Sequence, residues 1–514
     1  MRNWSTKFLT GSITIALAAT VAGCGSSNQS GTGASASPQA TKAASKEPIA
    51  IKILTTTYAE APPTDVEAIK KLNEKFNVKL SFEYAPVNGY QEKLNALLAS
   101  NDLPDVTLVW DLNGVQSYAN AAKQGAFWEL TPYIKNYSNL AKYDTAIYKG
   151  LLFEGKTYGI PRVRPLDGHR SLVIRQDWLD KLGLKVPQNM DELWKVMDAF
   201  TNNDPDGNGK KDTYAVGATG EGGFANSYTI MFGTSDKWTL DGKGGIIPSF
   251  LTPQFRQGIE YWSKAFKAGF LPQDLPILKS SQGKDQMVQG KAGIAFGNVN
   301  DSFGYNQIIQ KTDPKAKFVS YELPAAPDGK RYYDKASGSF GQMVINKKSV
   351  NEEKLKKILE IYDYTATKEG YFLTAYGIQD VDYKTTSLPF LVTQTEEGKK
   401  KYTSNSSQWL SGIFNKYSRG ESSGMTDEEI KHNYQVIDAI APNSYPDPSA
   451  GLVSPTGLEK GADWTKKLQD GVMNVVIGKS NMDDFDKLVK SFKDDSAYQK
   501  YIAEMNAGYK ANQK

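Results

Sequence analysis

Apolar residues in the N-terminal part of the chain follow first a strand period and then a helix period. Residues 49–54 read Ile-Ala-Ile-Lys-Ile-Leu, which predicts a β-strand. Residues 64–67, Thr-Asp-Val-Glu, have the form of a capping box and are followed by an apolar stripe at helical spacing. This stripe consists of Val66, Ile69, Leu72 and Phe76. Residues 78–84 predict a second strand.

The next segment repeats this order and ends in polar residues. Leu94, Leu97 and Leu98 mark a second helix, and residues 104–110 predict a third strand. Strands that alternate with helices imply a parallel sheet with right-handed crossovers. Trp110 and Asp111 follow the carboxyl end of the third strand, which is where open α/β sheets bind their ligands. We therefore expect both residues at a binding site.

The alternation continues through the rest of the chain. The pattern predicts helices that begin near residues 189–192, cover 255–270 and fill 482–511, and strands at 290–297, 318–323 and 341–346. Asn298 follows the strand at 290–297, so it becomes a binding candidate by the same reasoning as Asp111. The sequence shows no internal repeat of solenoid period.

The first 24 residues account for the single cysteine of the chain. Arg2 and Lys7 precede an apolar stretch, residues 8–23, that is too short to span a bilayer core of about 30 Å. Residues 21–24, Val-Ala-Gly-Cys, resemble the lipobox of bacterial lipoproteins. We therefore expect a signal peptide over residues 1–23, lipidation of Cys24, and a protein anchored to the extracytoplasmic face of the cell membrane. The alternative is a chance run of small residues that ends in a buried cysteine.

The segment after the cysteine contains almost no large apolar residue. Residues 24–48 consist mainly of Ser, Gly, Ala, Thr, Gln and Asn. Such a segment cannot bury enough surface to offset the entropy of ordering it. We expect a flexible tether between the lipid anchor and the folded body.

Composition excludes several kinds of site. The 514 residues include 61 basic and 57 acidic ones, for a net charge of +4, so no strong field for nucleic acid is present. Only two histidines and one cysteine occur. His169, His432 and Cys24 cannot build a zinc finger or a disulfide framework, and a Ser-His-Asp triad has few residues to draw on.

Three motifs resemble those of the lipid-anchored solute-binding proteins of bacterial ABC importers, in particular the large oligosaccharide-binding group. They are residues 158–162 (YGIPR), 174–184 (IRQDWLDKLGL) and 204–212 (DPDGNGKKD). Weaker similarities occur at residues 290–293 and 369–378. The resemblance extends over nearly the whole chain after Cys24.

The resemblance implies an α/β architecture of the two-lobed periplasmic-binding-protein type (type II), in which each lobe is a sheet flanked by helices. The lobes are discontinuous in sequence and close on the ligand. The family pattern places the first lobe at residues 49–160 and 315–365, and the second at 165–312 and 366–514. The implied partners are an oligosaccharide and the permease subunits of an importer, with no nucleic acid, and the implied state is a monomer.

The third motif has the spacing of a calcium loop. Oxygen-bearing side chains occupy its positions 1, 3, 5 and 9, which are Asp204, Asp206, Asn208 and Asp212, and Lys210 can offer its backbone carbonyl at position 7. Position 12 is Ala215, so the usual bidentate glutamate is missing. We expect a structural Ca²⁺ whose remaining ligands are water or a distant carboxylate. The alternative is a polar turn without metal.

Aromatic and arginine side chains are the candidates for sugar binding, because flat rings cover the apolar faces of sugars and charged groups bind their hydroxyls. Trp110, Trp238 and Trp409 lie beside polar sequence and are expected in the binding site, with core packing as the alternative for each. Arg162 and Arg164 follow the first lobe, where they can bind hydroxyls or a uronate carboxylate. Their alternative role is a hinge salt bridge.

We therefore predict a binding protein without catalytic residues that captures an oligosaccharide and delivers it to an ABC permease. Two other functions remain open. A carboxylate-pair glycosidase is one, since a chain with 57 acidic residues always offers some pair. A surface glycan adhesin is the other, although adhesins usually contain repeats.

Overall fold

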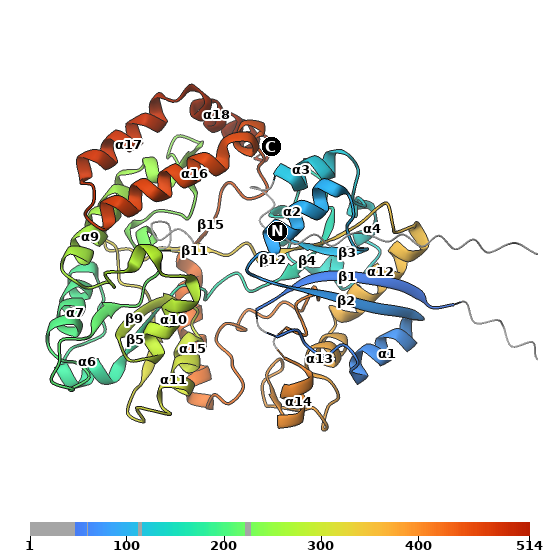
Figure 1. The fold of residues 1–514 in the computed structure, drawn as a ribbon, viewed down its shortest axis with the longest axis horizontal. Helices are drawn as coiled ribbons and strands as arrows, with labels where there is room; N and C mark the ends of the chain where they lie inside the picture. Colours follow the sequence, from blue (N-terminus) through green and yellow to red (C-terminus); the bar gives the residue numbers. More distant parts are fainter. Residues whose placement is uncertain (1–46, 59, 111–115, 221–227, 404, 514) are drawn as a thin grey trace, which may run out of the picture. The chain divides into compact units, whose positions relative to one another are not determined.

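The predicted alternation of strands and helices forms a sheet of five strands (Figure 1). The computed structural model describes residues 47–58, 60–110, 116–220, 228–403 and 405–513. The strand order is β2-β1-β3-β12-β4. The bounds are β1 Ile49–Thr57, β2 Val78–Pro86, β3 Val106–Val109, β4 Gly159–Val163 and β12 Ser339–Ile345. Strand β1 pairs in parallel with β2 and β3, as the pattern predicts, whereas β12 is antiparallel to β3 and β4.

Helices of the N-terminal part follow the predicted positions, with one local difference. The bounds are α1 Glu67–Phe76, α2 Tyr90–Ser100, α3 Gln116–Lys123, α4 Thr131–Ile134 and α5 Thr145–Lys149. Helix α1 begins after Val66, whose side chain forms no capping hydrogen bond, so the capping box expected at residues 64–67 is not formed. The apolar stripe is correct, and Leu72 is fully buried.

A second sheet has four strands in the order β10-β5-β9-β6. The bounds are β5 Ser171–Arg175, β6 Tyr214–Val216, β9 Ala292–Gly297 and β10 Phe318–Tyr321. Its helices are α6 Gln176–Leu182, α7 Met190–Asn202, α9 Pro253–Lys267, α10 Ser280–Val288 and α11 Asp301–Ile309. Helix α7 starts where predicted, because the Asn189 side chain accepts a hydrogen bond from the Glu192 backbone N–H. This α/β architecture with flanking helices is the predicted fold class.

The remaining elements are helices and short strand pairs. The pairs are β7 Trp238–Leu240 with β8 Ile246–Pro248, β11 Tyr333–Lys335 with β15 Ser444–Pro446, and β13 Tyr383–Thr385 with β14 Val392–Gln394. The helices are α12 Glu352–Thr365, α13 Lys368–Tyr376, α14 Glu396–Lys401, α15 Asp427–Ile440, α16 Pro455–Val476, α17 Met482–Asp494 and α18 Ser496–Ala511. The last three, red in Figure 1, pack on one another, and α16 also packs on α9.

Each large sheet has its own hydrophobic core, although residues 48–514 form one compact unit. The first core joins the five-stranded sheet to α12 through Leu355, Ile358 and Leu359. The second joins the four-stranded sheet to α7, α9, α15 and the C-terminal helices. Because each sheet packs on its own core, apolar strand patterns occur in two separate parts of the sequence.

Strand pairing differs from the expected division of the chain at two places. Strand β10 belongs to the four-stranded sheet, so the segment 315–321 lies with the second sheet and not with the first. Residues 408–411, expected in the second lobe, are attached to the first sheet: Val163 N–H donates to Ser411 O at 2.7 Å, and Thr55 Oγ1 donates to Gln408 O at 3.0 Å. The chain therefore passes from the second sheet back to the first between β10 and β12.

Among the helices of the described residues, none combines the length and the apolar character that a membrane span requires.

Candidate functional site

Two aromatic side chains meet at the carboxyl end of β3. The ring of Trp110 lies 5.5 Å from that of Phe340, which is 37% exposed, and 4.5 Å from that of buried Tyr90. Gly341 permits this approach: its φ is 74°, and a Cβ atom there would lie 2.3 Å from the Val109 carbonyl oxygen. A bulge in the β12–β4 pairing occurs at the same point. Trp110 is thus half-buried at the sheet edge where it was expected.

Arg162 lies behind this aromatic pair. Its side chain is 1% exposed, its guanidinium lies 5.2 Å from the Phe340 ring centroid, and its Nη2 donates to Gln408 Oε1. Its Nε and Nη1 have no hydrogen-bond partner among the described residues. Burial, and then the neighbouring charge of Arg164, lower the pKa of Arg162 to about 9. A buried cation with unused donors is costly unless something else pairs with it.

Arg164 and Asn298, the next two predicted residues, are connected through Arg419. Arg419 Nη1 donates to Asn298 Oδ1 at 3.2 Å, and the charge of Arg164 acts directly on Arg419. Burial and Arg164 together lower the pKa of Arg419 to about 10, and burial lowers that of Arg164. Asn298 itself is held by Asp301, whose Oδ2 accepts its backbone N–H at 2.8 Å. The structure thus brings the predicted Arg162, Arg164 and Asn298 into one cluster.

A polar cavity of about 540 Å³ adjoins Asn298 at the end of β9 and the start of α11. Its lining includes Asn300, Asp301, Tyr305, Arg170 and Lys284. This volume lies within the range of about 300–1,000 Å³ that is typical of small-ligand sites. Burial raises the pKa of Asp301, because few groups offset the loss of water around its carboxyl group. Hydroxyl-binding side chains beside tyrosine rings are suited to a saccharide.

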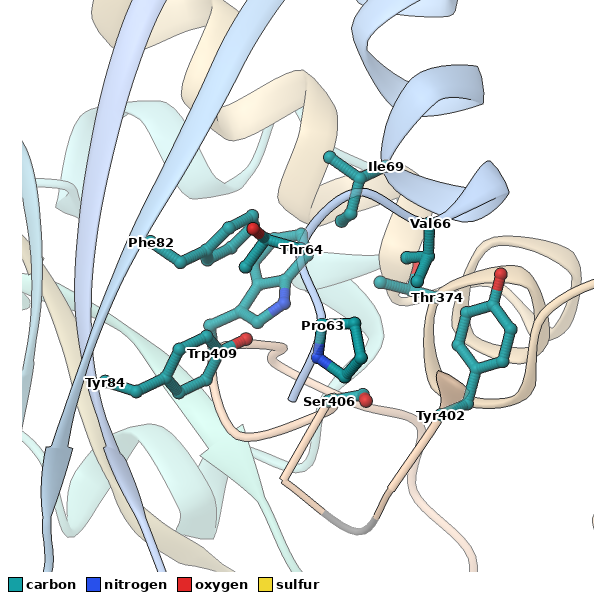
Figure 2. A pocket seen from close by; sticks show the side chains of 10 residues that line it. All are labelled: Pro63, Thr64, Val66, Ile69, Phe82, Tyr84, Thr374, Tyr402, Ser406 and Trp409. Atoms are coloured by element: carbon teal, nitrogen blue, oxygen red, sulfur yellow. The ribbon is translucent and has the colours of Figure 1, made fainter. Parts of the chain in front are cut away.

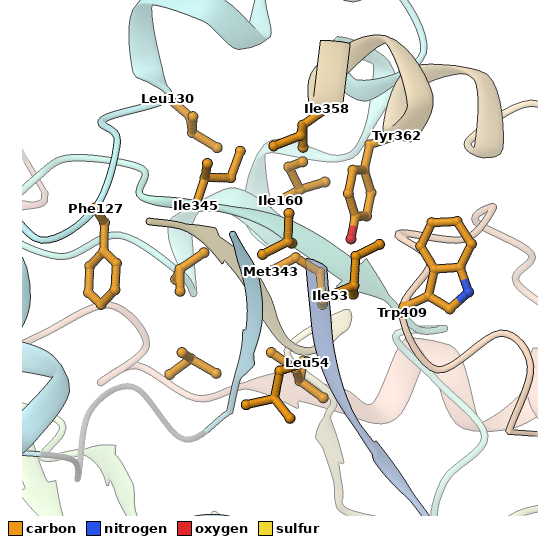
Figure 3. Close-up of a cluster of buried hydrophobic side chains, with 14 of the residues drawn as sticks. Ile53, Leu54, Phe127, Leu130, Ile160, Met343, Ile345, Ile358, Tyr362 and Trp409 are labelled. Atoms are coloured by element: carbon orange, nitrogen blue, oxygen red, sulfur yellow. The ribbon is translucent and has the colours of Figure 1, made fainter. Parts of the chain in front are cut away.

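Trp409 does not reach this cavity. Its side chain is 1% exposed and packs 5.2 Å from Phe82 and 6.0 Å from Tyr362, so it belongs to the core of the first sheet. Figure 2 shows its ring beside a pocket whose volume is only about 10 Å³, about enough for one water molecule. Figure 3 shows the same ring beside Tyr362 at the edge of the core cluster. The ligand-stacking role expected for Trp409 is therefore corrected to core packing.

Trp238 is buried as well. It is 4% exposed and packs with Ile246, Leu452 and Met505, with its ring 5.4 Å from that of Tyr501. Its polar neighbours in sequence belong to the turn of the β7–β8 hairpin, which is why the local sequence suggested exposure. The structure gives Trp238 a packing role.

In the predicted calcium loop, two carboxylates accept hydrogen bonds from the same side-chain amide, that of Asn208. Asn208 Nδ2 donates to Asp206 Oδ2 at 2.7 Å and to Asp212 Oδ1 at 3.1 Å, while Asn208 Oδ1 accepts the Lys210 backbone N–H. The Asp204 carboxylate accepts the backbone N–H groups of residues 207, 208 and 209. The oxygens of Asp206 and Asp212 thus surround one point, and rotation of the amide would direct Oδ1 to that point. These residues fit a cation that binds oxygen.

Carboxylates alone do not complete this loop. No group of three or more His, Cys, Asp or Glu side chains in the described part of the chain is arranged to hold a metal. A cation at residues 204–212 therefore needs the Asn208 amide, the Lys210 carbonyl and water in addition to the aspartates. Two further predicted residues, Asp111 and Cys24, lie outside the described residues.

The sequence did not identify several residues of this site. Phe340 and Arg419 are the main ones, with Asn300 and Tyr305 in the cavity. Residues 337–341, Ser-Gly-Ser-Phe-Gly, contain a signal, since an aromatic residue between glycines suits an exposed bulge. Arg419 has no such local signal, because its position depends on contacts with Arg164 and Asn298.

The model of the family described as bacterial extracellular solute-binding protein matches residues 57–370. The chain belongs to this family. As a solute-binding protein it also resembles curated relatives over most of its length. It is 31% identical over 489 residues, 94% of each chain, to the polygalacturonan/rhamnogalacturonan-binding protein YtcQ of Bacillus subtilis (strain 168). It is 28% identical to lipoprotein LipO of the same organism, over 86% of this chain and 89% of LipO.

Solved structures of solute-binding proteins share the fold. The crystal structure of alginate-binding protein AlgQ2 without calcium ion superimposes with a TM-score of 0.70 at 19% identity, and the match covers 91% of this chain and 99% of AlgQ2. At this identity the likeness concerns the fold alone. It agrees with the two sheets and flanking helices described above.

Proposed function

We propose that the protein is an extracytoplasmic solute-binding lipoprotein that captures an oligosaccharide and delivers it to the permease of an ABC importer. The observation that carries the proposal is the polar cavity of about 540 Å³, one of whose lining residues, Asn300, bonds to Arg419, in a chain of the solute-binding family. A ligand that contacts both sheets gives the closed state a higher affinity than the open one, and so drives closure. The protein acts as a monomer and performs no chemistry on the ligand.

The proposal is tested by ligand-dependent stabilisation without turnover. The full-length chain in detergent is mixed with neutral and acidic oligosaccharides, including pectic fragments because YtcQ is named for these polymers. We expect one class to raise the melting temperature, since a ligand at a hundredfold excess over Kd stabilises by about 2.7 kcal/mol. No new reducing ends should form. Release of reducing ends at a sustained rate would favour the glycosidase instead.

The lipid anchor is the second part of the proposal. Residues 21–24 have the lipobox pattern, and the relative LipO is named a lipoprotein. We expect Cys24→Ala to release the protein from the membrane fraction of cells that express it, because the change removes the thiol that receives the lipid. Immunoblotting of membrane and soluble fractions after a carbonate wash measures the release. Ser26→Ala is the matched control and should remain in the membrane, and an equally retained Cys24→Ala variant would contradict the anchor.

We also propose a structural Ca²⁺ at residues 204–212. Asp204, Asp206, Asn208 and Asp212 would supply side-chain oxygens and Lys210 a backbone carbonyl, while Asp204 also accepts the hydrogen bonds that hold the loop. The loop follows α7, whose last residues pack on β6, so a cation there would fix the connection between helix and strand. Its removal should affect stability more than ligand affinity.

A further inference from the structure

The arginines of the described residues fall into two groups. Four form ion pairs with carboxylates, at distances of 2.6–3.7 Å between nitrogen and oxygen. They are Arg170 with Asp334, Arg175 with Asp177, Arg256 with Asp486, and Arg331 with Glu322. The other three, Arg162, Arg164 and Arg419, form no ion pair with a described carboxylate, and they are the three that form the cluster at the candidate site.

The three unpaired arginines repel one another. The charge of Arg164 lowers the pKa of both Arg162 and Arg419, and burial lowers it further. Arg162 is 1% exposed, and two of its nitrogens form no hydrogen bond with a described residue. Arg164 donates to the backbone carbonyl of Val163, and Arg419 to the amide of Asn298. Arg162 is fully buried and Arg164 and Arg419 are half-buried, and like charges that lose part of their water near one another destabilise the ligand-free protein.

Among the residues that the structure describes, the acidic groups near the cluster form no ion pair with these arginines. Asp167 attracts Arg419 but forms no ion pair with it, and one oxygen of Asp167 is buried without a hydrogen bond. Asp301 holds Asn298, and burial raises its pKa, so its negative charge is disfavoured. Tyr58 and Tyr371 act electrostatically on Arg162 and Arg164, but neither side chain is a carboxylate that could form an ion pair.

The arginine cluster is connected to the saccharide-sized cavity. The Asn300 backbone N–H donates to Arg419 O at 2.8 Å, and Asn300 and Ser422 are among the residues that line the cavity. A ligand in the cavity would therefore contact Asn300, the residue that is hydrogen-bonded to the backbone of Arg419. Phe340 covers Arg162, and its side chain is 37% exposed.

We propose that the ligand is a uronate-containing, anionic oligosaccharide whose carboxylate binds between Arg164 and Arg419, with Arg162 behind them. The inference rests on the proposed function and specifies the charge of its ligand. Planar guanidinium groups match the geometry of a carboxylate with two parallel hydrogen bonds, and an anion would remove the mutual repulsion of the cluster. The rings of Trp110 and Phe340 are placed to cover an adjacent sugar face.

Calorimetry with two matched ligands tests this assignment. Trigalacturonate and its fully methylated ester have the same size and hydroxyls but differ in charge, and galactotriose and maltotriose serve as neutral probes. We expect the full-length chain to bind trigalacturonate at least 10-fold more tightly than the ester. Arg164→Met and Arg419→Met should each weaken trigalacturonate binding about 10- to 100-fold, because each removes hydrogen bonds to a charged group. Arg256→Met, which removes an exposed charge on α9, is the matched control and should bind as the wild type does.

Melting temperatures separate recognition from a structural role. If Arg164 and Arg419 hold the fold, their replacement lowers the melting temperature of the ligand-free protein. If they bind an anion and repel one another in its absence, their replacement relieves this repulsion, and the melting temperature of the ligand-free protein stays the same or rises. Tight binding of a neutral probe with no preference for trigalacturonate would overturn the inference but leave the proposed function intact. Binding of no saccharide at all would overturn both.

Discussion

Trp409→Ala is expected to lower the free energy of unfolding by about 3–5 kcal/mol, the usual cost of removing a large buried aromatic side chain. The indole ring is 1% exposed and fills space between Phe82 and Tyr362. Denaturant unfolding followed by tryptophan fluorescence or circular dichroism measures the loss.

Trp110→Ala is the comparison for this experiment. Trp110 is half-buried and contacts exposed Phe340, so its removal should cost less stability and should reduce ligand affinity instead. The fraction of Trp409→Ala that remains folded should bind ligand as the wild type does. If Trp409→Ala kept wild-type stability and lost affinity, the ring would have to be a ligand contact, and the assignment to the core would be wrong.

Removal of divalent cations is expected to lower the melting temperature, and millimolar Ca²⁺ is expected to restore it. A cation bound only by the folded loop stabilises by about 2.7 kcal/mol at a hundredfold excess over Kd. Without the cation, the carboxylates of Asp206 and Asp212 share the single amide of Asn208. Mg²⁺ should restore stability poorly, because it requires a tight octahedron of ligands and the loop completes its shell with water and backbone. Differential scanning calorimetry with chelator, Ca²⁺ or Mg²⁺ measures these shifts.

Two variants make the calcium experiment specific. Asp206→Ala should melt at the temperature of the chelated wild type and should no longer respond to chelator. Asp198→Ala changes an exposed aspartate on α7, outside the loop, and should respond as the wild type does. Identical melting of the wild type with Ca²⁺ and with chelator would leave the loop as a hydrogen-bonded turn without metal.

Local patterns predicted the elements well because burial on one face leaves a periodic trace in the sequence. The strand at residues 49–54 and the helix that begins at Asn189 lie where they were expected. The capping box at residues 64–67 was wrong, because α1 starts at Glu67 behind an uncapped Val66. The expected division of the chain differs from the strand pairing at β10, since nothing local to residues 318–321 tells which sheet that strand will join.

The site was predicted in part for a similar reason. Trp110 and Asn298 follow strands whose carboxyl ends could be identified from the pattern. Arg162 and Arg164, within and just after β4, were expected only from the resemblance, which placed them between the lobes. Trp409 was misplaced because its neighbours Gln408 and Ser411 are polar, yet both are buried and bonded to the first sheet. Arg419 could not be found locally, because its importance comes from the other two arginines that remain unpaired.

The place of β12 in the first sheet has a consequence for the order of folding. Strands β3 and β4 are both fully buried, yet each has β12 as a neighbour, and Val109 pairs with Gln342 from a distant part of the chain. The sheet therefore cannot be completed until residues 339–345 are available, and pairings between distant segments form slowly. Until then, the N-terminal part lacks the strand that lies between β3 and β4 and completes the sheet. Refolding should accordingly be slow and limited by the insertion of β12. Fragments that end before residue 339 should expose the unpaired edges of β3 and β4 and should be prone to aggregate.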